Sequence, residues 1–190
     1  AGHLEGERAR LRLALHSVGA GVADARRKAA EGLVTGTELH LRDLGFPAPV
    51  VEVAFEDLPE PGARGTVSAT LLFASDSSLT PGPVSRVASG GELSRLVLAL
   101  RLASGIGDVE VVAFDEIDAG VGGSTALRVG EKLAALAEHH QVLCVTHLPQ
   151  IAAFADTHYT VDRVAGSARA RRVEGQARLS ELTRMLSGIE

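Results

Sequence analysis

Two short apolar segments, residues 111–114 and 142–145, constrain the fold of this chain more than any other feature. They belong to predicted strands at 109–114 and 141–146, and a helical pattern at 123–138 lies between them. A strand, a helix and a second strand in this order predict a parallel pair joined by a right-handed crossover. Their uninterrupted apolar character is typical of strands that are buried on both faces of a sheet. The sequence therefore predicts an α/β fold with a partly parallel sheet.

The rest of the chain supplies further elements around this pair. The predicted elements are helices at 91–104, 149–154 and 178–187, strands at 50–55 and 66–73, and a hairpin of 157–163 with 169–174. The strands at 50–55 and 66–73 alternate apolar and polar residues, and the turn-rich stretch 58–65 joins them into an antiparallel hairpin. A polar loop at 75–84 then leads to the helix at 91–104.

The first part of the chain is predicted to be one long helix with the repeat of a coiled coil. The apolar seam consists of Leu4, Leu11, Val18 and Ala25, with Leu15, Val22 and Ala29 at four-residue offsets. Gly45 and Pro47 end the helix. We expect residues 1–45 to be the end of a longer coiled-coil helix and residues 46–190 to form the α/β lobe. An amphipathic helix packed on its own domain is the alternative.

The amino-acid composition limits the classes of protein to which this chain can belong. A chain of 190 residues, 45% of them hydrophobic, is long enough to bury a core of its own. Cys144 is the only cysteine, so no disulfide can form within the chain, and a reducing, cytoplasmic setting is expected. Its apolar surroundings predict a small buried side chain rather than a nucleophile. No segment approaches the roughly 18 consecutive apolar residues of a membrane span, so no membrane association is expected.

The charge balance does not indicate a dedicated nucleic-acid-binding chain. The net charge is −5, and the chain has one tyrosine and no tryptophan on which bases could stack. Two basic clusters, at 26–28 and 169–172, are interpreted as solvated faces. Direct contact of this chain with DNA is therefore not predicted from its composition.

The segment Ser89-Gly90-Gly91-Glu92 opens the helix at 91–104 and has two interpretations. Ser89 at the N-cap and Glu92 three residues later fit a capping box. Capping does not explain two glycines in the first turn, where each costs about 1 kcal/mol relative to alanine. Glycines there would let an anion reach bare N–H groups at the positive end of the helix dipole. We interpret the segment as a phosphate contact. The apolar residues Leu93, Leu96, Val97 and Leu100 are expected to face the core.

Polar side chains end both apolar strands, at the sheet edge where open α/β sheets bind ligands. Asp115 and Glu116 follow the first strand, and His147 follows the second. Two adjacent carboxylates can have different roles. One can bind Mg²⁺, which keeps several of its waters, and the other can activate a water molecule as a general base. A simple helix cap is the alternative for the two acids. His147 could contact a phosphate oxygen or the attacking water, or be only structural.

The sequence lacks the motifs of two kinds of site, a phosphate-binding P-loop and a zinc site. A phosphate-cradling loop of the form G-x-x-x-x-G-K-[ST] needs a lysine, and neither Lys28 nor Lys132 ends such a motif. The chain therefore holds half of a nucleotide site. The remaining histidines show no spacing typical of metal ligands, so no zinc site is predicted.

Four stretches together resemble the RecN family, the SMC-like ABC ATPases of bacterial DNA double-strand-break repair. They are 87–95, 114–123, 142–153 and 181–188. The first resembles the signature motif of all ABC proteins, whereas the Asp-Glu-Ile-Asp-Ala-Gly-Val and Thr-His-Leu-Pro-Gln sequences are more specific to RecN. The resemblance implies the C-terminal half of an ABC-type, P-loop NTPase head, with signature, Walker B, D-loop and H-loop segments.

The resemblance also implies a role for each site residue. Ser89, Gly90 and Gly91 would contact the γ-phosphate of an ATP bound by a partner head. Asp115 would serve Mg²⁺, Glu116 would be the general base, and His147 the switch histidine. Asp118 would lie in the loop that communicates between heads. The implied cofactor-binding set is Ser89, Gly90, Gly91, Glu92 and Asp118, and the cofactors are ATP and Mg²⁺.

The implied partners are the N-terminal P-loop half of the same protein, a second head, and DNA through the intact protein. Two other functions stay open at this point. One is a nucleotide-binding fragment of an ABC transporter, which would carry its own P-loop and no heptad helix at its start. The other is a non-catalytic head-dimerisation module whose motifs are remnants.

Overall fold

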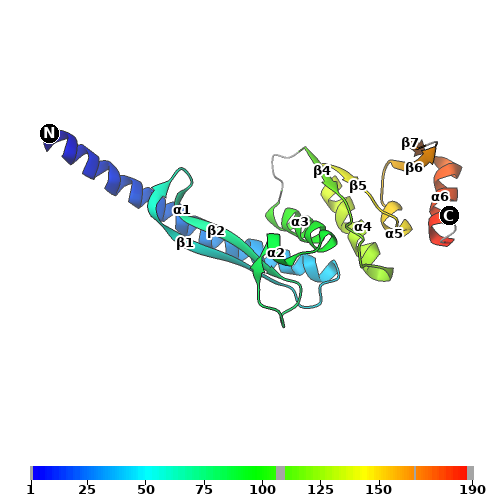
Figure 1. Cartoon of the computed structure of the whole chain (residues 1–190), viewed down its shortest axis with the longest axis horizontal. Helices are drawn as coiled ribbons and strands as arrows, with labels where there is room; N and C mark the ends of the chain where they lie inside the picture. Colours follow the sequence, from blue (N-terminus) through cyan, green and yellow to red (C-terminus); the bar gives the residue numbers. More distant parts are fainter. Residues whose placement is uncertain (1, 106–109, 165, 188–190) are drawn as a thin grey trace.

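The computed structural model describes residues 2–105, 110–164 and 166–187, and the molecule is elongated (Figure 1). In chain order the elements are α1 (Gly2–Asp43), β1 (Val50–Gly62), β2 (Gly65–Ala74), β3 (Gly82–Pro83), α2 (Val84–Val87), α3 (Gly90–Ser104), β4 (Val111–Phe114), α4 (Gly123–Ala137), β5 (Gln141–Cys144), α5 (Pro149–Ala152), β6 (His158–Val164), β7 (Ser167–Val173) and α6 (Gly175–Ser187). The start of α1 lies at one end of the molecule, and the β6–β7 hairpin with α6 lies at the other. The predicted α/β fold is confirmed.

The pair β4–β5 is parallel, as predicted, and α4 joins its strands. Residue 109, the predicted start of the first strand, lies outside the described residues. Burial on both faces was a wrong prediction: Val112 and Phe114 are buried, but Val111 is 46% and Leu143 54% exposed. The described elements cover only one face of this two-stranded sheet. The apolar residues on the second face therefore do not serve the core of the described part of the chain.

The three-stranded sheet has the order β1-β2-β3, and its long hairpin lies along α1. The hairpin is longer than predicted, because the ladder extends through the turn-rich stretch to the pair Gly62–Gly65 after a register shift beyond Asp57. Backbone pairing needs no apolar side chains, and β1 is an edge strand, where prolines are tolerated. The predicted polar loop at 75–84 includes the short strand β3 at its end.

α1 packs on the rest of the chain only through its later part. Gly19, Ala23, Thr37 and Leu41 are buried, whereas every described residue from 2 to 18 is exposed. The first seam residue, Leu4, is 74% exposed. The alternative of a helix packed on its own domain thus describes the C-terminal part of α1, and the coiled coil stays a prediction for the rest. Among the described residues, no helix is both long and apolar enough to cross a membrane.

The glycines of α1 provide a test of this arrangement. A Cβ at Gly21 or Gly32 would meet no atom within 4 Å, but a Cβ at Gly19 would collide with the Thr66 side chain of β2. We expect Gly21→Ala and Gly32→Ala each to raise the free energy of unfolding by about 0.5–1 kcal/mol, because alanine loses less backbone entropy in a helix. Gly19→Ala should not be stabilising. Thermal melting of the three variants checks this, and equal gains at all three positions would contradict the packing of the hairpin on α1.

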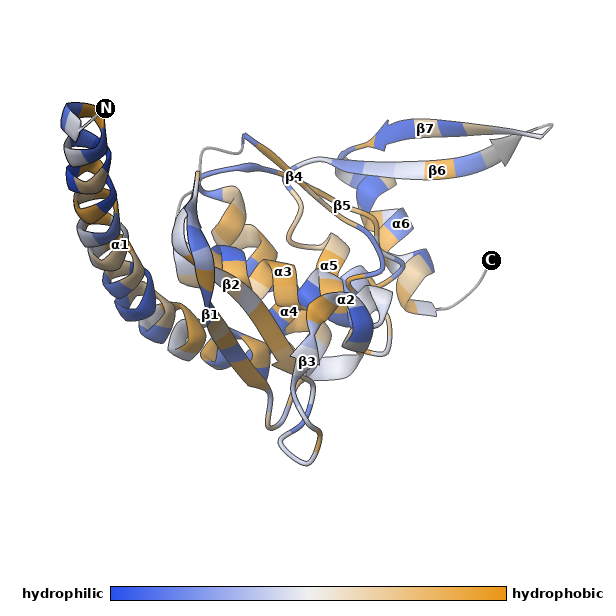
Figure 2. Cartoon of the chain, turned by 60° about the vertical axis from the view of Figure 1, so that its left-hand side comes forward, coloured by the Kyte–Doolittle hydropathy of each residue, from blue (hydrophilic) through white to orange (hydrophobic). Residues whose placement is uncertain are grey.

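One continuous core joins α1 to the α/β lobe. In Figure 2, the hydrophobic colour is concentrated on α3, α4 and the β1–β2 hairpin, which contribute to this core. Its buried members include Leu41, Leu44 and Phe46 from the end of α1, Val51 and Phe73 from the hairpin, Leu96 and Leu98 from α3, Val112, Phe114 and Ile117 from the β4 region, and Val129 and Leu133 from α4. This core fixes the position of α3 and β4 relative to the end of α1.

The register of α3 differs from the prediction. Leu96 is fully buried as expected and Leu100 is half-buried, but Leu93 and Val97 are 41% and 36% exposed. Leu98 and Ala99 are buried in their place. The reason is that α3 packs on two sides, against α1 and against the loop after β4, so that its buried face is wider and turned relative to the simple apolar stripe.

Candidate active site

The first turn of α3 is capped as the capping-box interpretation predicts. The Ser89 side chain accepts a hydrogen bond from the Glu92 backbone N–H at 3.4 Å, and a Glu92 carboxylate oxygen accepts from the Ser89 N–H at 2.9 Å. The second of these bonds lowers the pKa of Glu92 below its usual value. The Glu92 carboxylate is therefore engaged by Ser89, and the Ser75 side chain contributes a further hydrogen bond.

The two glycines have a structural role that sequence reasoning missed. We call residues 115–119 the acid loop. A Cβ at Gly90 would overlap the Glu116 carboxylate, and a Cβ at Gly91 would lie 2.7 Å from Ala119 Cβ and 2.9 Å from the Glu116 carbonyl oxygen. The glycines let α3 lie directly against the acid loop. This close approach brings the Glu116 carboxylate beside the first turn of α3.

The acid loop has an unusual backbone at Glu116. Its φ is 55°, in the left-handed region, where it is the one non-glycine residue among those described. A non-glycine residue there costs roughly 1–2 kcal/mol, so its surroundings must hold it. Asp115 Oδ1 accepts from the Glu116 N–H at 2.9 Å, Ser94 Oγ donates to the Asp115 carbonyl oxygen at 2.7 Å, and the Ala119 N–H donates to the Glu116 carbonyl oxygen at 2.9 Å.

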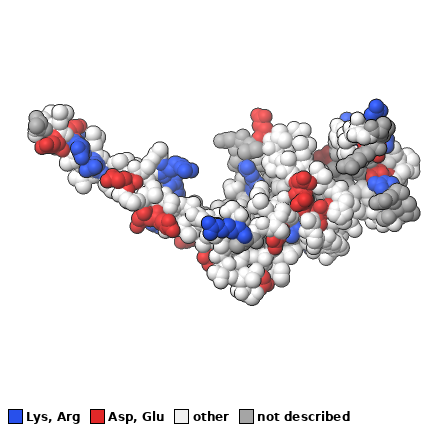
Figure 3. Space-filling model, viewed as in Figure 1, with Lys and Arg blue, Asp and Glu red and all other residues white. Residues whose placement is uncertain are grey.

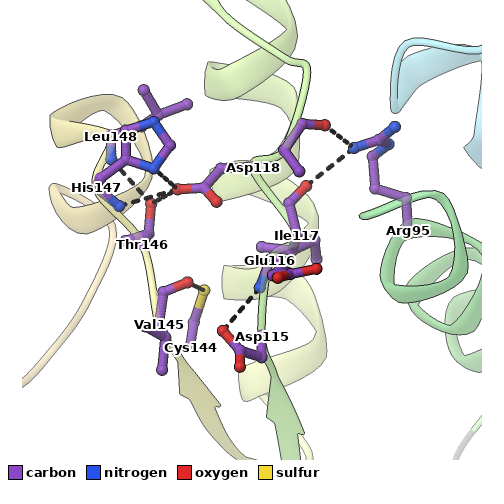
Figure 4. A network of polar contacts seen from close by, with 11 residues as sticks. Arg95, Asp115, Glu116, Ile117, Asp118, Cys144, Val145, Thr146, His147 and Leu148 are labelled. Atoms are coloured by element: carbon purple, nitrogen blue, oxygen red, sulfur yellow. Dashed lines mark hydrogen bonds and ion pairs between the residues drawn. The ribbon is translucent and has the colours of Figure 1, made fainter. Parts of the chain in front are cut away.

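Asp118 points into the chain, where it contacts the residues that follow β5 (Figure 4). Its Oδ2 accepts from Thr146 Oγ1 at 2.6 Å and from the His147 N–H at 2.9 Å, and it lies 3.0 Å from His147 Nδ1. The contact with Nδ1 needs a hydrogen on that nitrogen, which leaves Nε2 for other partners. The His147 side chain is 76% exposed and that of Asp118 only 6%. Asp118 thus fixes the orientation of an accessible histidine.

The fold therefore brings the predicted residues together. Asp115, Glu116 and His147 lie at the carboxyl ends of β4 and β5, and α3 presents Gly90 beside Glu116. Two residues of this site were missed, Arg95 and Thr146. No local signal identified Arg95, because its partners, the Ile117 and Ala119 carbonyl oxygens and the Phe46 ring, come from distant parts of the sequence.

Arg95 is a buried arginine that joins three parts of the chain. Its Nη1 donates to the carbonyl oxygens of Ile117 at 3.2 Å and Ala119 at 2.8 Å (Figure 4). Its guanidinium carbon lies 5.1 Å from the centre of the Phe46 ring, within the range of a cation–π interaction. Burial lowers the pKa of Arg95, but the usual value is so high that the side chain stays charged.

The donor set of the site fits one weakly chelated magnesium ion. Within the described residues, no group of three or more His, Cys, Asp and Glu side chains could hold a metal ion. Mg²⁺ does not need such a group, because it keeps several waters and binds through one or two carboxylates. The exposed Asp115 carboxylate, with one oxygen held by the Glu116 N–H, is a suitable single ligand.

The basic clusters are largely exposed, and some of their arginines pair with acidic residues of the chain. Arg27 lies 3.4 Å from Asp24 and 3.7 Å from Asp57, and its guanidinium is 5.6 Å from the centre of the Phe55 ring. In the second cluster, Arg172 pairs with Glu174 at 2.6 Å. On the face shown in Figure 3, basic and acidic side chains are interspersed along the molecule. These contacts agree with the interpretation of the clusters as solvated faces.

Cys144, at the end of β5, is expected to be unreactive. Burial raises the pKa of its thiol to about 11, and the nearby Asp118 and Asp115 add to the increase. The reactive thiolate should therefore be about 100-fold scarcer than in the unfolded chain near neutral pH. We expect alkylation by iodoacetamide to be slower by about that factor and to accelerate about tenfold per pH unit up to pH 11. Rapid labelling of the folded chain at pH 7.5 would contradict this environment; urea-unfolded chain is the control.

With this geometry established, we compared the chain with known proteins. No protein-family model matches it. The DNA repair protein RecN of Deinococcus radiodurans is 43% identical to it over 192 residues, which cover 99% of this chain and 34% of the relative. The chain belongs to the RecN family. It spans about a third of the length of this RecN relative.

Solved structures agree with the fold of this RecN segment. The SMC head domain with a coiled coil and joint from Pyrococcus yayanosii has a TM-score of 0.65 and 17% identity, covering 96% of this chain and 34% of that one. A chain solved in work on ATP-driven dimerization and DNA-stimulated activation of SMC ATPases has a TM-score of 0.53 and 17% identity, covering 87% of this chain and 96% of that one. The RecN chain therefore has the fold of the C-terminal half of an ABC-type head.

Proposed function

We propose that this chain is the signature-bearing half of an ATP-hydrolysing head that acts in the repair of DNA double-strand breaks, in the bacterial cytoplasm at the nucleoid. One observation carries the proposal: Asp115, Glu116 and His147 lie at the carboxyl ends of two paired parallel strands, with Glu116 beside the glycine-containing first turn of α3. A repair protein at 43% identity and the SMC-head fold support it. Membership of the RecN family argues against the transporter alternative.

In this proposal each residue acts on a different part of the reaction. Asp115 would hold Mg²⁺, which supplies charge neutralisation on the phosphates when bound. Glu116 would take the proton from the attacking water as general base. His147 would hydrogen-bond a phosphate oxygen or that water through Nε2, while Asp118 keeps the ring oriented.

Ser89 and the first N–H groups of α3 would contact the terminal phosphate of an ATP held by a second head. The Ser89 hydroxyl and the partial positive charge of the helix N-terminus are the donors that the chain offers for this contact. Glu92 would act through Ser89, because its carboxylate is held by the Ser89 N–H. We propose that two heads close on ATP in this way and separate after hydrolysis, and that DNA meets the intact protein.

The partner that would complete the nucleotide site is the P-loop half of the same protein. Exposed apolar residues on the uncovered face of β4–β5 and on β6 support this proposal: Val111, Leu143, Val145, Tyr159 and Val161. Among the described strands, β5 pairs only with β4, and a wide groove separates β5 from β6 and α6. An exposed apolar sheet face and an unpaired strand edge are both typical of a surface that another segment covers.

ATP hydrolysis is the test of this function. We would measure it for this chain alone, for the separately produced P-loop half, and for their mixture. The proposal predicts turnover in the mixture only. Turnover by this chain alone would mean that the phosphate site is built differently. Absence of turnover in a stable mixed complex would instead favour the non-catalytic dimerisation module.

A further inference from the structure

Arg95 is buried at the meeting point of α3, the acid loop and the segment that follows α1. We propose that Arg95 is a positioning residue, which holds the acid loop in its strained form and makes the placement of Glu116 depend on the end of α1. This inference rests on the proposed function for its catalytic consequence, but not for its structural part.

The first step concerns the strain in the acid loop. The left-handed φ of 55° at Glu116 is unfavourable for a side chain with a Cβ, so neighbouring contacts must maintain it. Arg95 donates to the carbonyl oxygens one and three residues further along, those of Ile117 and Ala119. A charged donor shared between two carbonyl oxygens fixes the path of the loop immediately after Glu116.

The second step leads from Arg95 to α1. Phe46 follows the end of α1 closely and is tied to it, because its N–H donates to the Leu41 carbonyl oxygen at 3.1 Å. The ring of Phe46 packs edge-on against Phe73 of β2, with centroids 5.6 Å apart and planes at 85°. Its face lies next to the Arg95 guanidinium. A displacement of the end of α1 would therefore move the ring on which Arg95 is stacked.

The third step concerns the choice of arginine. Only a planar guanidinium can stack on a ring and donate sideways to backbone carbonyls at once; a lysine ammonium is a point charge. Within the described residues, Arg95 Nε is buried without a hydrogen-bond partner. The Nη1 bonds and the Phe46 ring position the side chain, and the Glu92 carboxylate adds an electrostatic attraction. If these contacts are lost, the acid loop should become more mobile and should not be held in place by a different contact.

Hydrogen exchange of this chain tests the structural part without ATP. In Arg95→Met we expect peptides covering 115–121 to exchange about tenfold faster, as loss of a charge-assisted hydrogen bond implies, while β1, β2 and α4 are unchanged. Arg95→Lys should give a smaller increase in the same peptides. Phe46→Leu keeps an apolar side chain in the core and should also accelerate them. The control is Arg128→Met, which removes an exposed arginine paired with Glu131.

Unchanged exchange of the acid loop in Arg95→Met would overturn the proposal. If that variant fails to fold, Phe46→Leu decides: unchanged loop exchange, or faster exchange throughout the chain, would equally overturn it. The catalytic part is tested in the head completed by the P-loop half. There Arg95→Lys should lower kcat at least fivefold and leave the KM for ATP within twofold, because Arg95 acts on the reaction through the loop that carries Glu116. Failure of the wild-type head to hydrolyse ATP would count against the proposed function alone.

Discussion

Glu116→Gln is expected to lower ATP turnover of the completed head by about 10²–10⁴-fold, the usual contribution of a general base. Glutamine has nearly the same shape but cannot accept the proton of the attacking water. Binding of ATP and closure of two heads should persist, since neither needs that proton transfer. We therefore expect the variant to accumulate as an ATP-bound dimer, measured by turnover assay and by size-exclusion chromatography with light scattering.

The matched control for this prediction is Glu131→Gln on α4, which removes only an exposed ion pair with Arg128 and should leave turnover unchanged. Undiminished turnover in Glu116→Gln would reject Glu116 as the base. A loss of turnover without dimer accumulation would retain the base but reject the proposed closure of two heads around ATP.

Gly91→Ala is expected to have the largest effect on stability. The added Cβ would lie 2.7 Å from Ala119 Cβ and 2.9 Å from the Glu116 carbonyl oxygen, and neither atom is the end of a flexible side chain. Either α3 or the acid loop must move. Overpacking of this kind costs about 1–3 kcal/mol, and we expect the free energy of unfolding in urea to fall by that amount. Turnover of the completed head should fall as well, because the loop carries Glu116.

Gly122→Ala is the control for this substitution. Gly122 is the N-cap of α4, its φ of −164° suits any residue, and a Cβ there meets nothing within 4 Å. It should therefore be neutral within about 0.5 kcal/mol, as is usual for surface positions. Equal stability of Gly91→Ala and Gly122→Ala would show that α3 does not pack against the acid loop as described.

The parts of the fold that local sequence specifies were predictable. The parallel pair β4–β5 follows from two apolar segments separated by a helix, and the capping box follows from Ser89 and Glu92 three residues apart. Such patterns report the backbone state and which residues prefer burial. They do not report how many faces find a covering partner in this chain, which is why burial of Val111 and Leu143 was predicted and is not observed.

Tertiary contacts explain what was missed at the site. Gly90 and Gly91 were interpreted through a ligand, whereas the structure also gives them a neighbour, the acid loop, from a distant part of the sequence. Arg95 resembled any charged residue on a helix, because nothing local announces two carbonyl oxygens and an aromatic ring around it. The roles of Asp115 and Glu116 in catalysis remain predictions that the experiments above address.

The long first helix has a mechanical consequence. Its 42 residues give a rod of about 63 Å, and burial begins only at Gly19. Because the β1–β2 hairpin packs along α1 from Gly19 onward, helix and hairpin would tilt together as a lever: a tilt of about 5° at the root near Phe46 sweeps the far tip through about 5 Å. Because the helix is long, a small force applied at the tip produces a large torque at the root, where Phe46 contacts Arg95. A displacement at the root that is small enough to leave the core intact therefore becomes a movement of about 5 Å at the tip.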